Sequence, residues 1–72
     1  MWFNFLKEVL NEEKASRYAK YFLEHRMSFE QLRCLNLDYL DRMGVKLGDC
    51  ITILNHPKVN GIKYYFFSIN IL

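Results

Sequence analysis

Apolar residues recur every three or four positions from residue 2 to about residue 55, which is the spacing of an amphipathic helix and not of a strand. Short polar or glycine-containing segments interrupt this pattern, so the helices are predicted to be short and tightly connected. The pattern predicts five helices, over residues 2–10, residues 12–24, a short segment that follows Ser28 and holds Leu32 and Leu35, residues 37–43, and residue 47 to about residue 55.

The first two helices show the pattern most clearly. Burial is predicted for one stripe of each helix, made of Trp2, Leu6, Val9 and Leu10 in the first and of Ala15, Tyr18, Ala19 and Phe22 in the second. The residues off the second stripe are predicted to face solvent, and they are Lys14, Arg17, Lys20 and Tyr21.

Residues that start and end helices stand where these segments meet. Asn11 and Asn36 occupy positions where an N-cap side chain would accept a hydrogen bond from a backbone amide. Ser28, with a glutamine three residues later, fits a capping box. Gly44 suits the left-handed conformation that ends a helix, and Val45 is predicted to fold back as an apolar clamp.

The last predicted helix opens with Gly48 and Asp49, which places a carboxylate near the positive end of the helix dipole. Pro57 is the only proline, and because proline lacks a backbone amide it should end or kink this helix. The residues that this helix is predicted to bury are Cys50, Ile51 and Leu54. Together these features predict an all-α bundle of five helices as one domain, residues 1–60.

Residues 61–72 form a tail of different composition. Asn60 and Gly61 are a turn signal, and residues 62–72 are rich in aromatic and β-branched residues, which favour extended structure. Three alternatives stay open for this apolar tail: a loosely packed or disordered end, a segment folded back on the bundle, or a strand that pairs with another chain. An exposed segment of this composition is also an aggregation hazard.

Composition and charge narrow the class of protein. With 72 residues and 51% hydrophobic residues, the chain can build one small core, and partners often help to stabilise domains of this size. A net charge of +2 gives little attraction to nucleic acid. The start lacks a basic segment followed by a long apolar one, and no apolar run reaches the roughly 18–20 residues of a membrane span. We therefore expect an intracellular protein, cytoplasmic or nuclear, without a membrane span.

Residues with catalytic or metal-binding chemistry are sparse. Cys34 and Cys50 are predicted to be buried thiols in a reducing compartment, not a disulfide. His25 is expected to interact with a helix C-terminus, and no motif pairs it or His56 with a nucleophile. Close cysteine or histidine pairs of the kind that bind zinc are missing, and the three glycines form no phosphate loop. We expect no enzyme activity, no metal and no cofactor.

The order of these features resembles a sterile alpha motif (SAM) domain over roughly residues 2–58. The resemblance implies a noncatalytic protein-interaction module of the kind found in signalling scaffolds, which binds another SAM domain, itself or another protein. The sequence departs from the family in two places: Asp49 replaces a basic or histidine residue, and Pro57 interrupts a helix that is usually long. The matching residues are Trp2, Leu6, Tyr18, Phe22, Met27, Leu32, Leu35, Leu40, Gly44, Val45, Gly48, Ile51, Ile53 and Leu54.

Many SAM domains associate head to tail, so the resemblance implies two binding surfaces. Residues 24–41 hold four acidic and two basic residues, whereas residues 42–63 hold four basic residues and one acidic residue. Opposite charges on two surfaces would orient such an association, although mixed charge is also normal on solvated helices. The expected mid-loop surface consists of Glu30, Asp38, Tyr39 and Asp41, and the expected end-helix surface consists of Lys46, Leu47, Gly48, Asp49, Thr52 and Asn55.

Two nucleic-acid interpretations compete with this hypothesis. A few SAM domains bind RNA hairpins through a basic patch near the first and last helices, and here Lys7, Lys46 and Lys58 are the candidates. A helix-hairpin-helix DNA binder typically requires a glycine-hydrophobe-glycine turn that presents amides to phosphate, whereas Gly44 and Gly48 are four positions apart. RNA hairpin binding is the alternative function.

Overall fold

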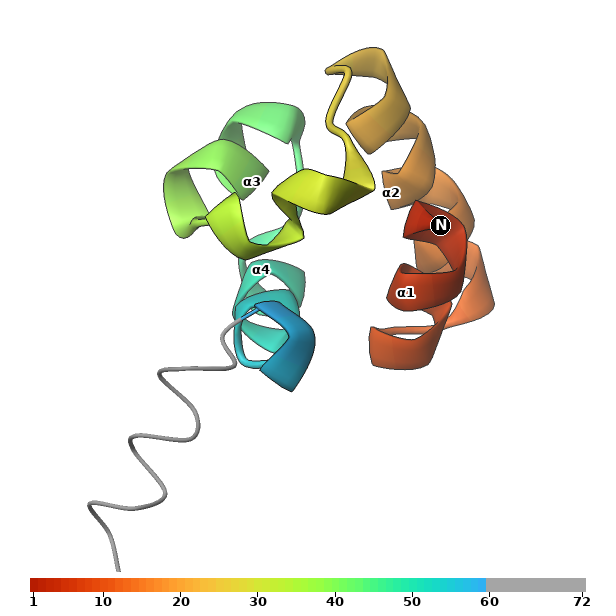
Figure 1. Cartoon of the computed structure of the whole chain (residues 1–72). Helices are drawn as coiled ribbons and strands as arrows, with labels where there is room; N and C mark the ends of the chain where they lie inside the picture. Colours follow the sequence, from red (N-terminus) through yellow and green to blue (C-terminus); the bar gives the residue numbers. More distant parts are fainter. Residues whose placement is uncertain (60–72) are drawn as a thin grey trace, which may run out of the picture.

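The computed structural model describes residues 1–59, and every regular element in that part of the chain is helical. The elements are α1 (Trp2–Val9), α2 (Glu12–Glu24), the 3₁₀ helix η1 (Phe29–Cys34), α3 (Leu37–Met43) and α4 (Leu47–Leu54) (Figure 1). Residues 57–59 are again helical, so Pro57 stands at the start of a new turn. The predicted all-α fold is confirmed, and the predicted tail at residues 61–72 lies outside the described residues.

The predicted caps explain why the helices begin where they do. Asn11 accepts a hydrogen bond from the Lys14 amide at 2.8 Å, and Asn36 accepts one from the Tyr39 amide at 2.8 Å. The capping box at Ser28 is also present, although the helix that it opens is a 3₁₀ helix and not an α-helix. Each cap satisfies an amide that has no partner inside its helix, so these three starts are encoded locally.

A glycine turn sets α4 against α3. Gly44 has the predicted left-handed conformation, with φ 96° and ψ 15°. The Val45 amide donates back to the Leu40 carbonyl at 3.0 Å, and the Val45 side chain is buried. The Gly44 conformation and the Val45 contact end α3, and α4 begins three residues after Gly44, as the sequence predicted.

The helices surround one core, with α1 packed along α2 on one side and α3 and α4 on the other (Figure 1). The Trp2 ring stacks on Phe22 with centroids 4.1 Å apart, and its indole N–H donates to the Met27 carbonyl at 2.8 Å. This contact fixes α1 to α2 and to the segment that follows it. The buried apolar residues are Trp2, Phe5, Leu6, Ala15, Tyr18, Phe22, Leu32, Leu35, Leu40, Met43, Val45, Cys50, Ile53 and Val59.

Three predictions of burial or exposure were wrong. Ile51 is half exposed, because Cys50 and Ile53 face the core from α4 and Ile51 lies on another face. Cys34 is exposed, because η1 turns every three residues and places Leu32 and Leu35 inward instead. Tyr21 is partly buried and packs against the core, although it lies off the apolar stripe of α2.

Candidate functional site

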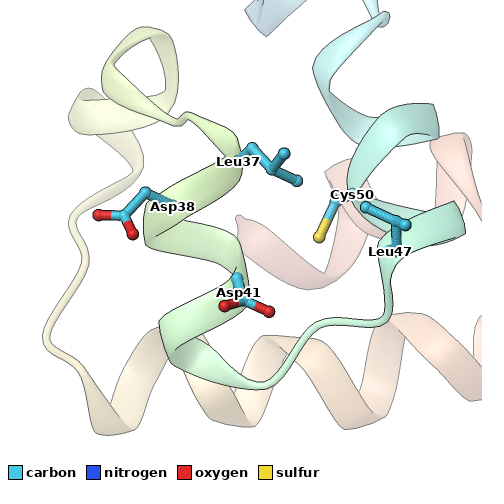
Figure 2. A pocket seen from close by; sticks show the side chains of 5 residues that line it. All are labelled: Leu37, Asp38, Asp41, Leu47 and Cys50. Atoms are coloured by element: carbon cyan, nitrogen blue, oxygen red, sulfur yellow. The ribbon is translucent and has the colours of Figure 1, made fainter.

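An open pocket of about 440 Å³ lies between α3 and α4. Figure 2 shows its lining side chains: Leu37 points from α3 toward α4, and Leu47 and Cys50 approach from the other side. Asp38 and Asp41 are also at its rim, and both come from α3. The pocket therefore combines exposed leucines with carboxylates, which is the composition of an interaction surface with an apolar centre and a polar rim.

The two carboxylates differ in their surroundings. Asp38 is paired with Arg42 one turn later at 3.0 Å, and both side chains are more than half exposed, so solvent screens this ion pair. Asp41 lies three residues after Asp38, and Figure 2 shows it on the side of α3 that faces Leu47. Among residues 1–59 no lysine, arginine or histidine forms an ion pair with Asp41. Asp41 is exposed on the surface of α3.

Two large apolar side chains are exposed beside these acids, and a third is exposed one helical turn further along α4. Leu37 is 47% exposed, Leu47 is 64% exposed and Ile51 is 50% exposed. Leu47 and Ile51 are one turn apart on α4, so they share a face of that helix. We call the group Leu37, Asp38, Asp41, Leu47 and Ile51 the α3–α4 surface.

Cys50 forms the floor of the pocket and is only 1% exposed, as predicted. Its thiol donates to the Val45 carbonyl at 3.4 Å. Burial raises the pKa of the Cys50 thiol, and the charges of Asp41 and Asp49 raise it further. Because the thiol stays protonated at neutral pH, Cys50 serves packing and is a poor nucleophile.

Asp49 is turned away from the pocket and holds α4 to α2. Its carboxylate accepts a hydrogen bond from the Tyr18 hydroxyl and pairs with the Lys14 ammonium at 3.0 Å, and its side chain is only 13% exposed. The Lys46 amide in turn donates to the Tyr18 hydroxyl oxygen at 3.4 Å. Burial raises the pKa of Asp49, but the hydrogen bonds from Tyr18 and Lys14 outweigh it and hold this pKa below its usual value.

Sequence reasoning missed this network, although one signal was present. Tyr18 lies on the buried stripe of α2, and a buried tyrosine hydroxyl normally requires a hydrogen-bond partner. Burial and the hydrogen bond to Asp49 raise the pKa of Tyr18. Nothing in the chain order, however, identifies a residue 31 positions later as that partner.

The remaining residues of the two expected surfaces are spread more widely. In the end-helix surface, Lys46, Gly48, Thr52 and Asn55 are exposed, and the Thr52 hydroxyl donates to the Gly48 carbonyl at 3.0 Å. In the mid-loop surface, Glu30 is exposed on η1, and Tyr39 lines a different pocket with His25, Met27, Arg42 and Met43. The structure thus brings Asp38 and Asp41 together with Leu47, and it places Tyr39 and Asp49 elsewhere.

The candidate RNA patch also has internal contacts. Lys58 pairs with Glu8 at 3.2 Å, and His56 lies 3.5 Å from the same carboxylate. The hydrogen bond and charge of Lys58 lower the pKa of Glu8. Lys7 lies over the Phe3 ring at 6.0 Å, and Lys46 is exposed at the start of α4. The carboxylate of Glu8 therefore offsets the positive charge of Lys58, one of the three lysines of this patch.

Other kinds of site find no support in the described part of the chain. Within residues 1–59, no group of three or more histidine, cysteine, aspartate or glutamate residues is arranged to hold a metal ion. No helix of that part is long and apolar enough to cross a membrane. Neither a protein-family model, nor a curated protein, nor a solved structure matches this chain.

Proposed function

We propose that this chain is a noncatalytic protein-interaction module of the SAM type, which binds a second copy of itself or another SAM-type domain. The observation that carries the proposal is the α3–α4 surface, where two half-exposed leucines line a pocket with two carboxylates and Ile51 is exposed one turn after Leu47. Support also comes from the order of short helices and from the glycine turn that joins α3 to α4.

Burial of the apolar side chains supplies the driving force in this proposal. Full burial of a leucine or isoleucine that was exposed stabilises a complex by roughly 1.5–3 kcal/mol. Leu37, Leu47 and Ile51 are already partly covered, so each contributes only a part of that value. The complex is therefore expected to be weak and concentration-dependent, which is typical of a transient module.

The carboxylates define the chemistry of the partner. Asp41 lacks an ion pair within residues 1–59, and the Asp38 pair is exposed enough to be replaced. A partner that presents a lysine or arginine next to an apolar side chain fits this rim. Opposite charge speeds the encounter and sets its orientation, so association should weaken as salt is added.

Solution mass, measured by light scattering over a series of concentrations and salt levels, tests this proposal. We expect the mass of the parent chain to rise with concentration and to fall with salt. The double variant Asp38→Lys/Asp41→Lys should stay monomeric with an unchanged circular dichroism spectrum. Glu12→Lys/Glu24→Lys makes the same charge change on α2 and serves as the matched control, which should behave like the parent.

Equal association of the parent and of Asp38→Lys/Asp41→Lys would refute the role of these acids. A monomer at every concentration would refute self-association and leave a different SAM-type domain as the partner. RNA hairpin binding would instead appear as a steep loss of affinity with salt and on Lys46→Glu. The pairing of Lys58 with Glu8 argues against that alternative.

A further inference from the structure

We propose that this chain associates with itself as a closed two-fold dimer through the α3–α4 surface, and not as an open head-to-tail chain. The inference rests on the proposed function and specifies its partner and its geometry. It starts from the finding that Asp41 and Leu47 line one pocket. These residues belong to the two different surfaces that a head-to-tail assembly would need.

An open chain requires each molecule to bind two neighbours at once through two separate surfaces. A neighbour that covers Leu47 in this pocket also covers Asp41, because the two residues line it from the α4 side and the α3 side (Figure 2). A neighbour seated there leaves no room in the pocket for a second one. A head-to-tail chain that used Asp41 and Leu47 as two separate surfaces would therefore need two neighbours in the same pocket.

The composition of the surface suits a two-fold contact, in which the same patch meets itself. Leu47 and Ile51 of one molecule can pack against the same apolar patch of the other. Asp41 and Lys46 form no ion pair among residues 1–59, and Lys46 is exposed directly before Leu47 in the chain. In a two-fold arrangement Asp41 of each molecule meets Lys46 of the other. The dimer then contains the same attractive pair of charges twice.

The size of the surface sets the expected affinity. Stable dimers bury about 800 Å² on each partner, and their apolar centres are usually larger than three side chains. A dimer built on Leu37, Leu47 and Ile51 is therefore expected to dissociate in the micromolar range or above, at about 10 µM to 1 mM. The full chain can be studied across that range by sedimentation equilibrium.

The first arm of the experiment measures the limiting mass of the full 72-residue chain. We expect the mass to rise with concentration and to level off at twice that of one chain. Growth beyond two chains would overturn the closed dimer while leaving the proposed self-association intact. A monomer throughout would overturn the dimer and restrict the proposed function to a different partner.

The second arm exchanges the two charges. Asp41→Lys and Lys46→Glu should each weaken the dimer about tenfold or more, because each places like charges opposite one another twice. An equimolar mixture of the two single variants should dimerise like the parent, and so should the double variant Asp41→Lys/Lys46→Glu. Failure of both combinations to restore association would refute the pairing of Asp41 with Lys46.

The third arm compares two exposed leucines. Leu47→Asp should abolish the dimer, whereas Leu23→Asp on α2, where Leu23 is 70% exposed, should leave it unchanged. Both positions are exposed, so both variants should keep the melting temperature of the parent within a few degrees. A dimer that persists in Leu47→Asp, or one that Leu23→Asp also abolishes, would overturn the inference.

Discussion

At the scale of single residues, Asp49 shows how a position expected to bind a partner can instead hold the fold together. Its carboxylate takes two hydrogen bonds from α2, one from the Tyr18 hydroxyl and one from the Lys14 ammonium. Both donors lie on α2 and Asp49 lies in the first turn of α4, so these two hydrogen bonds fix the start of α4 against α2. The exposed residues that precede and follow Asp49 are thereby held in place.

Replacement of this carboxylate should be measurable as a loss of stability. We expect Asp49→Asn to lower the free energy of unfolding at pH 7 by about 1–2 kcal/mol, because it weakens two partly buried hydrogen bonds. Urea denaturation of the two proteins measures the difference. Asp38→Asn changes only an exposed ion pair and should stay within about 0.5 kcal/mol of the parent.

The same network predicts a dependence on pH. The pKa of Asp49 is lower in the folded chain than in the unfolded chain, where it is about 3.9. The ionised carboxylate therefore stabilises the fold fully above the unfolded pKa, and this contribution is lost as the pH falls through the folded pKa. The stability difference between the parent and Asp49→Asn should be constant from about pH 6 to 8 and close below about pH 4. A difference that persists unchanged in acid would contradict the assignment.

At the scale of elements, the turn between α3 and α4 depends on the conformation of one glycine. Gly44 has φ 96°, and a side-chain methyl group at this position would lie 3.7 Å from Cε2 of Tyr21, an ordinary contact. The cost of a side chain there is thus conformational and does not come from a clash with a neighbour. Gly48 has open space around it and lies inside α4.

These two glycines should respond in opposite directions to alanine. We expect Gly44→Ala to destabilise the domain by about 1–2 kcal/mol, because alanine is strained in the left-handed conformation. Gly48→Ala should stabilise it by about 0.5–1 kcal/mol, because alanine is the better helix former. Thermal unfolding followed by circular dichroism measures both changes, and a neutral Gly44→Ala would show that the turn tolerates a side chain.

Local signals explain how much of the fold the sequence could predict. The caps at Asn11, Ser28 and Asn36 and the turn at Gly44 each act within a few residues, so the helix bounds followed from them. Burial was less predictable in the shorter elements. In α4 two apolar faces compete, and only tertiary packing decides that Ile53 is buried while Ile51 is not.

The candidate site was predictable only in part, for the same reason. Asp38, Asp41 and Leu47 were identified from their charge or from their place at the turn, but as members of two different surfaces. Their common pocket arises from the closure of α3 on α4, which is a tertiary feature. The contact of Asp49 with Tyr18 and Lys14 is likewise long-range, so no local pattern could reveal it.

At the scale of the whole molecule, association and stability are linked. A domain of this size is stabilised by only a few kcal/mol, and any partner that binds the folded state adds to that value. The exposed residues of the α3–α4 surface take no part in the buried cluster. Changes to these exposed residues should therefore alter association with little effect on folding.

This separation predicts a concentration effect that the surface variants should lose. The melting temperature of the parent should rise by a few degrees between dilute and concentrated samples, because the proposed dimer would form only from folded chains. In Leu47→Asp the melting temperature should not depend on concentration. Differential scanning calorimetry at two concentrations measures both, and an equal rise in the variant would place the association elsewhere on the molecule.

The most direct measurement of the central claim is a dilution series followed by ¹H–¹⁵N correlation spectra of the full chain. If the α3–α4 surface mediates association, amide shifts should move with concentration in residues 37–41 and 46–51. The amides of the exposed face of α2, including those of Lys20 and Leu23, should stay fixed. Shifts confined to α2 or to residues 61–72 would contradict the account, because association would then use another part of the chain.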